Sequence, residues 1–124
     1  DLPLALARRI AGDRLIVGIS CESPNDAIEA ERGGADYVSV SPVFATPTKT
    51  DTAPALGLDG VRAVRAAVRI PVVAIGGVKA TNAAEVVRAG ADGICVVSAI
   101  VSASDPRAAA ATLRDIVERA RHGA

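Results

Sequence analysis

The sequence predicts an α/β fold, in which parallel strands alternate with covering helices, on three observations. Short apolar runs rich in Val and Ile recur along the chain, and segments with helical spacing of apolar residues separate them. Residues 70–78 read Ile-Pro-Val-Val-Ala-Ile-Gly-Gly-Val, which indicates a strand buried on both faces and ended by two glycines. Of the 124 residues, 50% are hydrophobic and 2% are aromatic, which predicts a core of Ala, Val, Ile and Leu, as in parallel sheets.

The expected order is one helix followed by four strand–helix units. In the first helix, Leu2, Leu6 and Ile10 recur at helical spacing, and Gly12 acts as the stop signal. We expect helices at 2–11, 23–33, 58–68, 81–89 and 105–119, strands at 15–20, 36–41, 70–78 and 94–98, and a long loop at 44–58.

The later helices have recognisable starting residues. Ser23, followed by a proline, predicts an N-cap, and so does Asp105, which also precedes a proline. Thr81 and Asn82 are expected to cap the helix that follows the glycine pair. These signals place each helix directly after a predicted strand or loop, as a βα arrangement requires.

The tripeptide Gly-Ala-Asp occurs twice, at 34–36 and at 90–92, each time between a helix and a strand. A glycine after a helix and before a strand is ordinary αβ junction chemistry, so the repeat favours stacked, parallel βα units. Two consecutive strands are expected to end at Gly77 and Ser98. In (β/α)8 barrels the loops after the last two strands bind phosphate, and the sequence predicts a cradle of that type.

Composition excludes several classes of protein. Lys and Arg number 14, as do Asp and Glu, so no broad attraction to nucleic acid or to anionic membranes is expected. No apolar run approaches the ~20 residues of a membrane span, and no secretory signal opens the chain. Cys21 and Cys95 form no CxxC pair, which fits a reducing compartment. We therefore expect a soluble, cytoplasmic protein.

The strand ends provide the first candidate binding residues, Gly76 and Gly77 together with Val97 and Ser98. Backbone N–H groups at such junctions are unpaired and bind oxyanions. A simple strand-to-helix turn is the alternative for the glycine pair, since Gly is the commonest turn residue. Taken together, the two neighbouring strand ends favour phosphate binding.

Polar side chains follow the preceding strand. Thr46, Thr48 and Lys49 place two hydroxyls and an ammonium within four residues, a set suited to a multiply charged phosphate, although a solvated surface loop is the alternative. Ser20 closes its strand at the same end and either binds a ligand or caps the next helix. The single histidine, His122, lies in the tail, so no Ser/His/Asp or Cys/His arrangement is available.

The order of these motifs resembles the thiamine phosphate synthase family over nearly the whole chain. The Thr-Pro-Thr-Lys loop combined with the Ile-Gly-Gly strand end is the most specific part of the match. The motifs that carry the resemblance are Gly34-Ala35-Asp36-Tyr37-Val38, Pro42-Val43-Phe44, Thr46-Pro47-Thr48-Lys49, Gly57-Leu58, Pro71 to Val78, Gly90-Ala91-Asp92-Gly93 and Val97-Ser98-Ala99-Ile100.

The resemblance implies a Mg²⁺-dependent transferase of thiamine biosynthesis. Such an enzyme joins hydroxymethylpyrimidine diphosphate to thiazole phosphate and releases pyrophosphate, and the diphosphate leaves before the thiazole nitrogen attacks. By resemblance Lys49 and Ser20 are catalytic on the diphosphate side, and Asp1 ligates Mg²⁺. The resemblance assigns the thiazole phosphate to Thr46, Thr48, Gly77, Val97 and Ser98, and we expect Gly76 to be a substrate-binding residue beside them.

The match covers only the second half of a (β/α)8 barrel, about four βα units preceded by a helix, and we expect residues 1–124 to form one domain. Glu22 stands where the family usually has His, and Ser41 where it usually has Gly. The ligands of the family's first half are absent from the match, so we expect little or no catalysis by the isolated chain. The alternatives are a noncatalytic half-barrel module that binds phosphorylated ligands and a thiazole-tautomerase-like isomerase.

A chain that forms only half a barrel is also expected to need a partner. We expect an apolar inner face and two sheet edges with unpaired backbone groups, which proteins normally cover. The chain is therefore expected to form a homo-oligomer or to pair with the missing N-terminal half.

Overall fold

A computed structural model describes residues 3–44 and 55–123. Within them, four strands form one sheet in the order β1-β2-β3-β4, and neighbouring strands are parallel throughout. The strands are β1 (Gly18–Cys21), β2 (Tyr37–Val40), β3 (Val72–Ile75) and β4 (Gly93–Cys95). The helices are α1 (Leu4–Ala11), α2 (Pro24–Arg32), α3 (Gly57–Ala67), α4 (Ala83–Arg88), α5 (Ser98–Val101) and α6 (Pro106–Arg121). The predicted α/β class and the order of the five expected helices and four strands are confirmed, and α5 is an additional short helix that the sequence did not predict.

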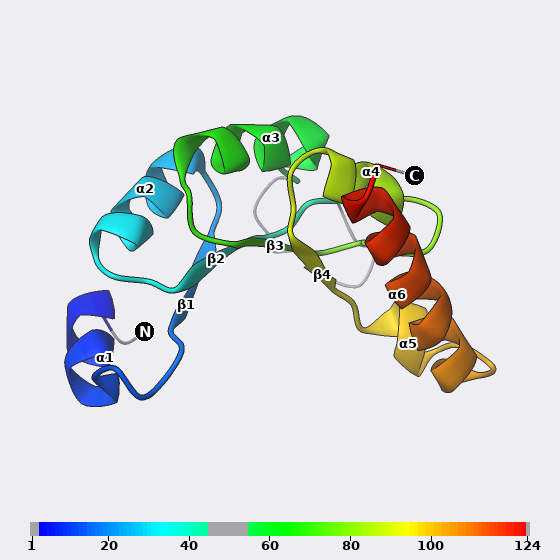
Figure 1. Cartoon of the computed structure of the whole chain (residues 1–124), viewed down its shortest axis with the longest axis horizontal. Coiled ribbons are helices and arrows are strands. Elements are labelled where there is room, and N and C mark those ends of the chain that lie inside the picture. Colours follow the sequence, from blue (N-terminus) through cyan, green and yellow to red (C-terminus); the bar gives the residue numbers. More distant parts are fainter. Residues whose placement is uncertain (1–2, 45–54, 124) are drawn as a thin grey trace.

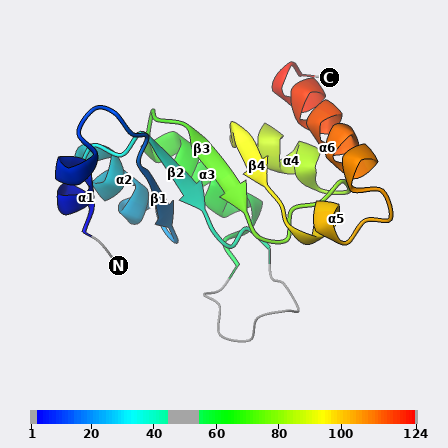
Figure 2. The same cartoon turned by 90° about the horizontal axis from the view of Figure 1, so that it is seen from below.

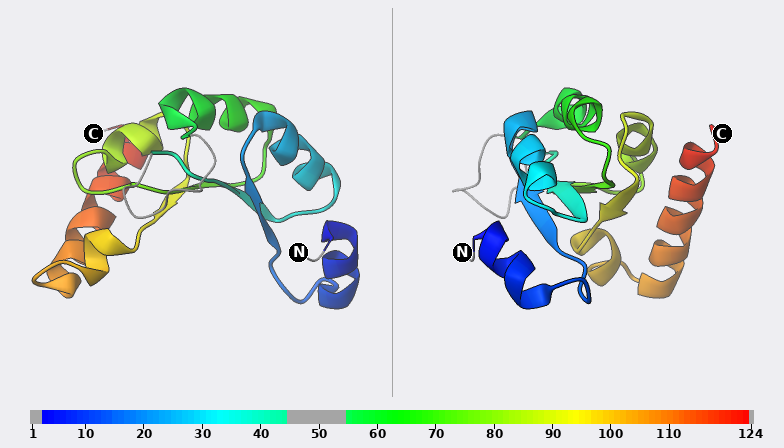
Figure 3. Two further views of the ribbon diagram at one scale, coloured as in Figure 1. Left: turned by 180° about the vertical axis from the view of Figure 1, so that it is seen from behind. Right: turned by 60° about the vertical axis from the view of Figure 1, so that its left-hand side comes forward.

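The sheet is curved, and the helices follow its convex side. Figure 1 shows α1, α2, α3, α4 and α6 in succession around an arch, with the sheet beneath them. The view from behind shows the same arch, and its concave side carries no helix of the described residues (Figure 3). Figure 2 shows the strands running in one direction, with α5 at the end to which they point. This is the geometry of part of a (β/α)8 barrel.

The core lies between the sheet and the helices. Val38, Val40, Val72 and Ala74 are fully buried there, and they alternate along their strands as a pleated sheet requires. The expectation that the strand at 70–78 is buried on both faces is wrong, because its other residues, such as Val73, stay partly exposed. They face the concave side, which nothing in the described residues covers.

The concave face differs in composition from the expected apolar surface. The strand register places small and polar residues there beside a few larger ones, so the expectation of an apolar inner face is wrong. Large exposed hydrophobic side chains lie instead next to the outer strands, for example Ile16 before β1 and Val97 after β4. The residues of the concave face are Gly18, Ser20, Tyr37, Ser39, Val73, Ile75, Gly93 and Cys95.

Two of the three predicted N-caps are confirmed. The Ser23 hydroxyl accepts the N–H of Asp26 at 3.1 Å, and the Asp105 carboxylate accepts the N–H of Ala108 at 3.1 Å. The third is wrong: Asn82 occupies the N-cap position of α4, but its side chain makes no capping hydrogen bond. That side chain bonds to the turn before the helix.

Both outer strands are shorter than expected. Pairing of β1 begins at Gly18. Before it, Leu15 O accepts a hydrogen bond from the Arg8 side chain, and Val17 bonds to both the backbone N–H and the carboxylate of Asp36. At the other edge β4 ends at Cys95, and Ser98 begins α5, so the prediction of a strand to Ser98 is wrong. An outer strand has a partner on one side only, which leaves its ends free for other contacts.

No helix among residues 3–44 and 55–123 is long and apolar enough to cross a membrane.

Candidate functional site

The loop after β3 is the centre of the candidate site. Gly76 and Gly77 have φ values of +103° and +68°, a left-handed region that favours glycine. A Cβ at Gly76 would lie 2.9 Å from Pro42 Cα, and one at Gly77 would lie 2.7 Å from Phe44 Cβ. The glycine pair is therefore required by the close approach of the neighbouring loop, in addition to any ligand.

That neighbouring loop follows β2 and is bonded directly to the end of β3. The N–H of Val43 donates to Ile75 O at 2.9 Å, and the N–H of Phe44 donates to Gly76 O at 3.0 Å. On the other side of residues 45–54, the N–H of Leu56 donates to Pro42 O at 2.9 Å. The predicted site residues Thr46, Thr48 and Lys49 lie outside the described residues, but both flanks of their segment are fixed beside the glycine pair.

The start of α5 is the second part of the site. Ile75 of β3 is paired with Cys95 of β4, so the residues that follow both strands lie at the same edge of the sheet. Val97 is at the N-cap position of α5 and Ser98 is its first residue. The structure thus brings Gly76, Gly77, Val97 and Ser98 to one rim, at the carboxyl ends of adjacent strands, where barrel active sites lie.

Ser20 lies near the carboxyl end of β1 with its side chain on the concave face. Its hydroxyl accepts a hydrogen bond from Ser39 at 3.3 Å, which is a side-by-side contact between paired residues of β1 and β2. Ser20 is exposed and does not cap α2, a role taken by Ser23. Of the two uses considered for Ser20, capping is therefore ruled out by the structure.

Sequence reasoning missed Ser39 as a site residue. It is the only polar residue among the buried ones in the described part of the chain, and it adds a second hydroxyl to the concave face beside Ser20. The signal was present in the sequence, because Tyr37 and Ser39 alternate with two core valines in β2. A polar residue at an alternate position of a strand marks the face opposite to the core.

The described residues do not fit a magnesium ion. Among them, no three His, Cys, Asp or Glu side chains are grouped so that they could hold a metal. The predicted ligand Asp1 lies outside the described residues.

The two cysteines occupy opposite faces of the sheet. Cys21 is fully buried under α2, and burial raises the pKa of its thiol to about 11, with the nearby Asp26 carboxylate adding to the effect. Cys95 is exposed on the concave face. At neutral pH Cys21 is therefore a protonated, inert core residue.

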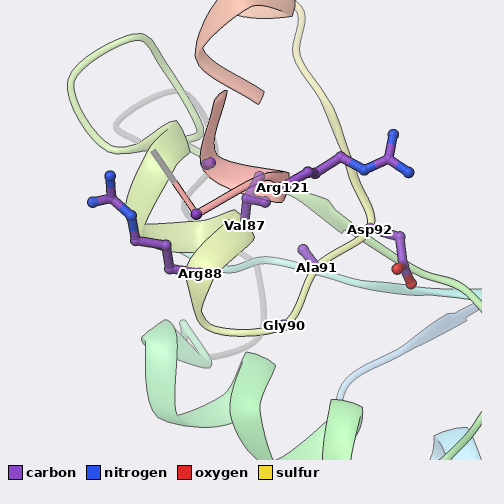
Figure 4. A pocket seen from close by; sticks show the side chains of 8 residues that line it. Val87, Arg88, Gly90, Ala91, Asp92 and Arg121 are labelled. Carbon is purple, nitrogen blue, oxygen red and sulfur yellow. The ribbon is translucent and has the colours of Figure 1, made fainter. Parts of the chain in front are cut away.

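A hollow of about 450 Å³ lies at the opposite end of the sheet from the rim. It is lined by the Gly-Ala-Asp junction before β4 and by the ends of α4 and α6. Figure 4 shows that the guanidinium groups of Arg88 and Arg121 extend in opposite directions, away from the space between them. The hollow therefore gathers no charge for an anion and is separate from the candidate site.

Comparison with known proteins gives a consistent result. The family model for thiamine monophosphate synthase matches residues 1–100. The thiamine-phosphate synthase of Chloroflexus aurantiacus is 56% identical over 117 residues, which are 94% of this chain and 54% of that protein. That of Moorella thermoacetica is 50% identical over 121 residues, which are 98% of this chain and 58% of that protein.

A solved structure agrees with these relatives. The thiamine phosphate pyrophosphorylase of Pyrococcus furiosus superposes with a TM-score of 0.87 at 44% identity, covering 98% of this chain and 57% of that one. The chain thus spans between half and three-fifths of the length of the proteins it matches.

Proposed function

The chain belongs to the thiamine monophosphate synthase family, and we propose that it forms the phosphate-binding half of a thiamine phosphate synthase. Such an enzyme couples hydroxymethylpyrimidine diphosphate to thiazole phosphate, and it releases thiamine phosphate and pyrophosphate. The observation that carries the proposal is the convergence of the Gly76–Gly77 loop, the start of α5 and the flanks of residues 45–54 on one rim.

In this proposal the rim binds the thiazole phosphate. The backbone N–H groups near Gly77 and Ser98 donate to the phosphate oxygens, and Gly76 and Val97 shape the loops that present them. The hydroxyls of Thr46 and Thr48 complete the set of donors. Neutral donors of this kind bind a phosphate without the further desolvation penalty of burying a charged partner.

The diphosphate side of the reaction is assigned to Lys49 and Ser20. The bond between the pyrimidine methylene carbon and the diphosphate oxygen breaks, and its electron pair leaves with the pyrophosphate. The thiazole nitrogen then supplies the electron pair of the new carbon–nitrogen bond. Negative charge grows on the leaving oxygen, so a lysine ammonium and a hydroxyl donor placed there lower the barrier. Ser39 lies beside Ser20 and orients its hydroxyl.

Magnesium is part of the proposal as the ion that neutralises the diphosphate when bound. Its ligands would be Asp1 and residues from the remainder of a complete barrel, since the described residues provide no group that could hold it. The proposed setting is the cytoplasm, whose reducing conditions fit the two free cysteines.

We also propose that the two outer strands are covered by a further part, either a second copy of the chain or the missing N-terminal half. β1 and β4 each have one unpaired edge within the described sheet. Beside β4 lies a hollow of about 360 Å³ whose apolar lining includes Ile94, Leu113 and Val117. Val97 and Val101 next to it are more than 70% exposed, and a neighbouring strand and helix would bury both side chains.

The activity is tested with both substrates and Mg²⁺, with thiamine phosphate and pyrophosphate as the products measured. The chain alone should show little or no turnover, and the chain mixed with the N-terminal part of the Chloroflexus relative should show clear turnover. Lys49→Ala should abolish it, whereas Arg62→Ala, which removes an exposed charge on α3, should not. Absence of product from every combination, with both parts folded, would leave phosphate binding without catalysis as the function.

The partner is tested by size-exclusion chromatography with light scattering. A dimer, or a stable complex with the N-terminal part, is expected at low micromolar concentration. A sharp monomer peak combined with cooperative unfolding would contradict the need for a partner.

A further inference from the structure

The side chain of Asn82 bridges the two ends of the turn that follows the glycine pair. Its Oδ1 accepts the N–H of Lys79 at 2.8 Å, and its Nδ2 donates to Gly77 O at 3.0 Å. Since Lys79 N is a donor and Gly77 O is an acceptor, the partners fix which end of the amide is which. The two hydrogen bonds use a donor and an acceptor on separate atoms of one short side chain, which Asn provides and an ionised Asp does not.

Two successive carbonyl oxygens in the loop after β3 each accept a hydrogen bond. Gly76 O accepts the N–H of Phe44 at 3.0 Å, and Gly77 O accepts the Asn82 amide. In a trans peptide the N–H points opposite to the carbonyl of the same unit. The N–H groups of Gly77 and Val78 therefore point away from Phe44 and Asn82.

These two N–H groups have no acceptor among the described residues. Successive backbone N–H groups in a loop with left-handed residues form a concavity that binds anions. The glycine pair by itself is free to rotate, because neither residue has a Cβ to restrict its φ and ψ angles. Other contacts must therefore fix the peptide planes of the glycine pair. The loop after β2 fixes only the first plane, through the hydrogen bond from Phe44 to Gly76 O.

We infer that Asn82 is a positioning residue that directs the Gly77 and Val78 N–H groups toward a bound phosphate. The inference rests on the proposed function, in which this rim binds a phosphate, and adds the residue that orders it. Asn82 acts through the backbone and does not itself contact the phosphate. The two hydrogen bonds explain why an N-cap position is occupied by a residue that does not cap.

The test is a titration of the ¹⁵N-labelled chain with inorganic phosphate, followed through the backbone amide signals. In the parent chain the Gly77 and Val78 amides should shift on addition of phosphate. Asn82→Ala and Asn82→Asp should each raise the Kd for phosphate about five- to tenfold, the effect of a displaced hydrogen-bond donor. Asn82→Asp keeps the acceptor for Lys79, so the turn itself is retained in that variant.

The control is Thr81→Ala, which changes the exposed neighbour of Asn82 and should leave the Kd unchanged. If the parent amides do not respond to phosphate, the proposed role of the rim is wrong. If they respond and both Asn82 variants bind phosphate as the parent does, the rim binds phosphate without Asn82 and the inference alone is overturned. A general loss of stability would affect amides throughout the chain, whereas loss of positioning affects the response of Gly77 and Val78.

Discussion

The guanidinium of Arg65 lies 2.7 Å from the carboxylate of Asp92, before β4, and the guanidinium of Arg8 lies at the same distance from the carboxylate of Asp36, before β2. In both places the aspartate also accepts a backbone N–H, from Val72 in one and from Val17 in the other. The two Gly-Ala-Asp tripeptides of the sequence are therefore the same structural device used twice, at the end of the sheet opposite to the candidate site.

Arg65 also closes the end of its own helix. It donates to Val68 O at the C-cap of α3 and to Ile70 O in the segment that follows, both at 2.9 Å. Arg65→Ala should lower the free energy of unfolding by about 1–3 kcal/mol, because partly buried carbonyls lose their donors. The measurement is urea denaturation followed by circular dichroism.

The matched control for that variant is Arg62→Ala on the same helix. Arg62 pairs with Asp59, whose side chain is 98% exposed, and such pairs contribute about 0–1 kcal/mol. Equal urea midpoints for the two variants would show that Arg65 contributes no more than a surface charge.

Stability should decrease in acid because two carboxylates are held in their charged form. Glu31 accepts the N–H groups of Arg69 and Ile70, which lowers its pKa below the ordinary value of 4.5. The guanidinium of Arg8 and the N–H of Val17 lower the pKa of Asp36 below 3.8. The unfolded chain then binds protons more readily than the folded one, so this stabilisation is complete above these values and is lost as the pH falls through the folded pKa.

The measurement is the melting temperature from about pH 7 down to about pH 3. At pH values below the ordinary glutamate pKa, Glu31→Gln should make the melting temperature fall less steeply with decreasing pH, because the amide does not titrate. The same slope in parent and variant would contradict a contribution from Glu31.

The glycine at position 77 should not tolerate a side chain. Gly77→Ala places a Cβ against Phe44 in a backbone conformation that alanine avoids, and a loss of about 1–3 kcal/mol in stability is expected, together with weaker phosphate binding. Gly93→Ala is the control, since a Cβ there meets nothing within 4 Å. Urea denaturation and the phosphate titration check both variants, and equal effects of the two substitutions would refute the close-approach argument.

The two cysteines should differ in reactivity. Iodoacetamide at neutral pH should modify Cys95 and leave Cys21 intact, because Cys95 is exposed whereas Cys21 is buried with a pKa of about 11. Mass spectrometry of the intact chain should show one adduct, and none in a Cys95→Ser variant. A second adduct formed at the same rate would mean that the core under α2 opens readily.

Much of the fold could be predicted from the sequence because its signals are local. The N-caps at Ser23 and Asp105 each depend on a side chain and a backbone group three residues apart. The order of elements followed from apolar spacing, and the Gly-Ala-Asp repeat indicated stacked units before Arg8 and Arg65 were known to hold them.

Most of the errors concern contacts between distant segments, and the error at Asn82 concerns a choice between two local sets of hydrogen bonds. The strand at 70–78 was expected to be buried on both faces, yet Val73 is partly exposed, because burial depends on what covers the other side of the sheet. The capping role expected of Asn82 was wrong, since its amide bonds to Lys79 and Gly77 instead. Ser39 was not selected, because its place beside Ser20 depends on strand register.

The sequence by itself determined the α/β class, the order of helices and strands and the residue types that mark the rim, because each of these depends on neighbours along the chain. Tertiary structure alone decided that Gly76 lies against Pro42 and that Gly77 lies against Phe44. Those contacts exist only after parallel strands have brought separate loops to one edge of the sheet, and pairing between strands is a long-range choice that local spacing does not specify.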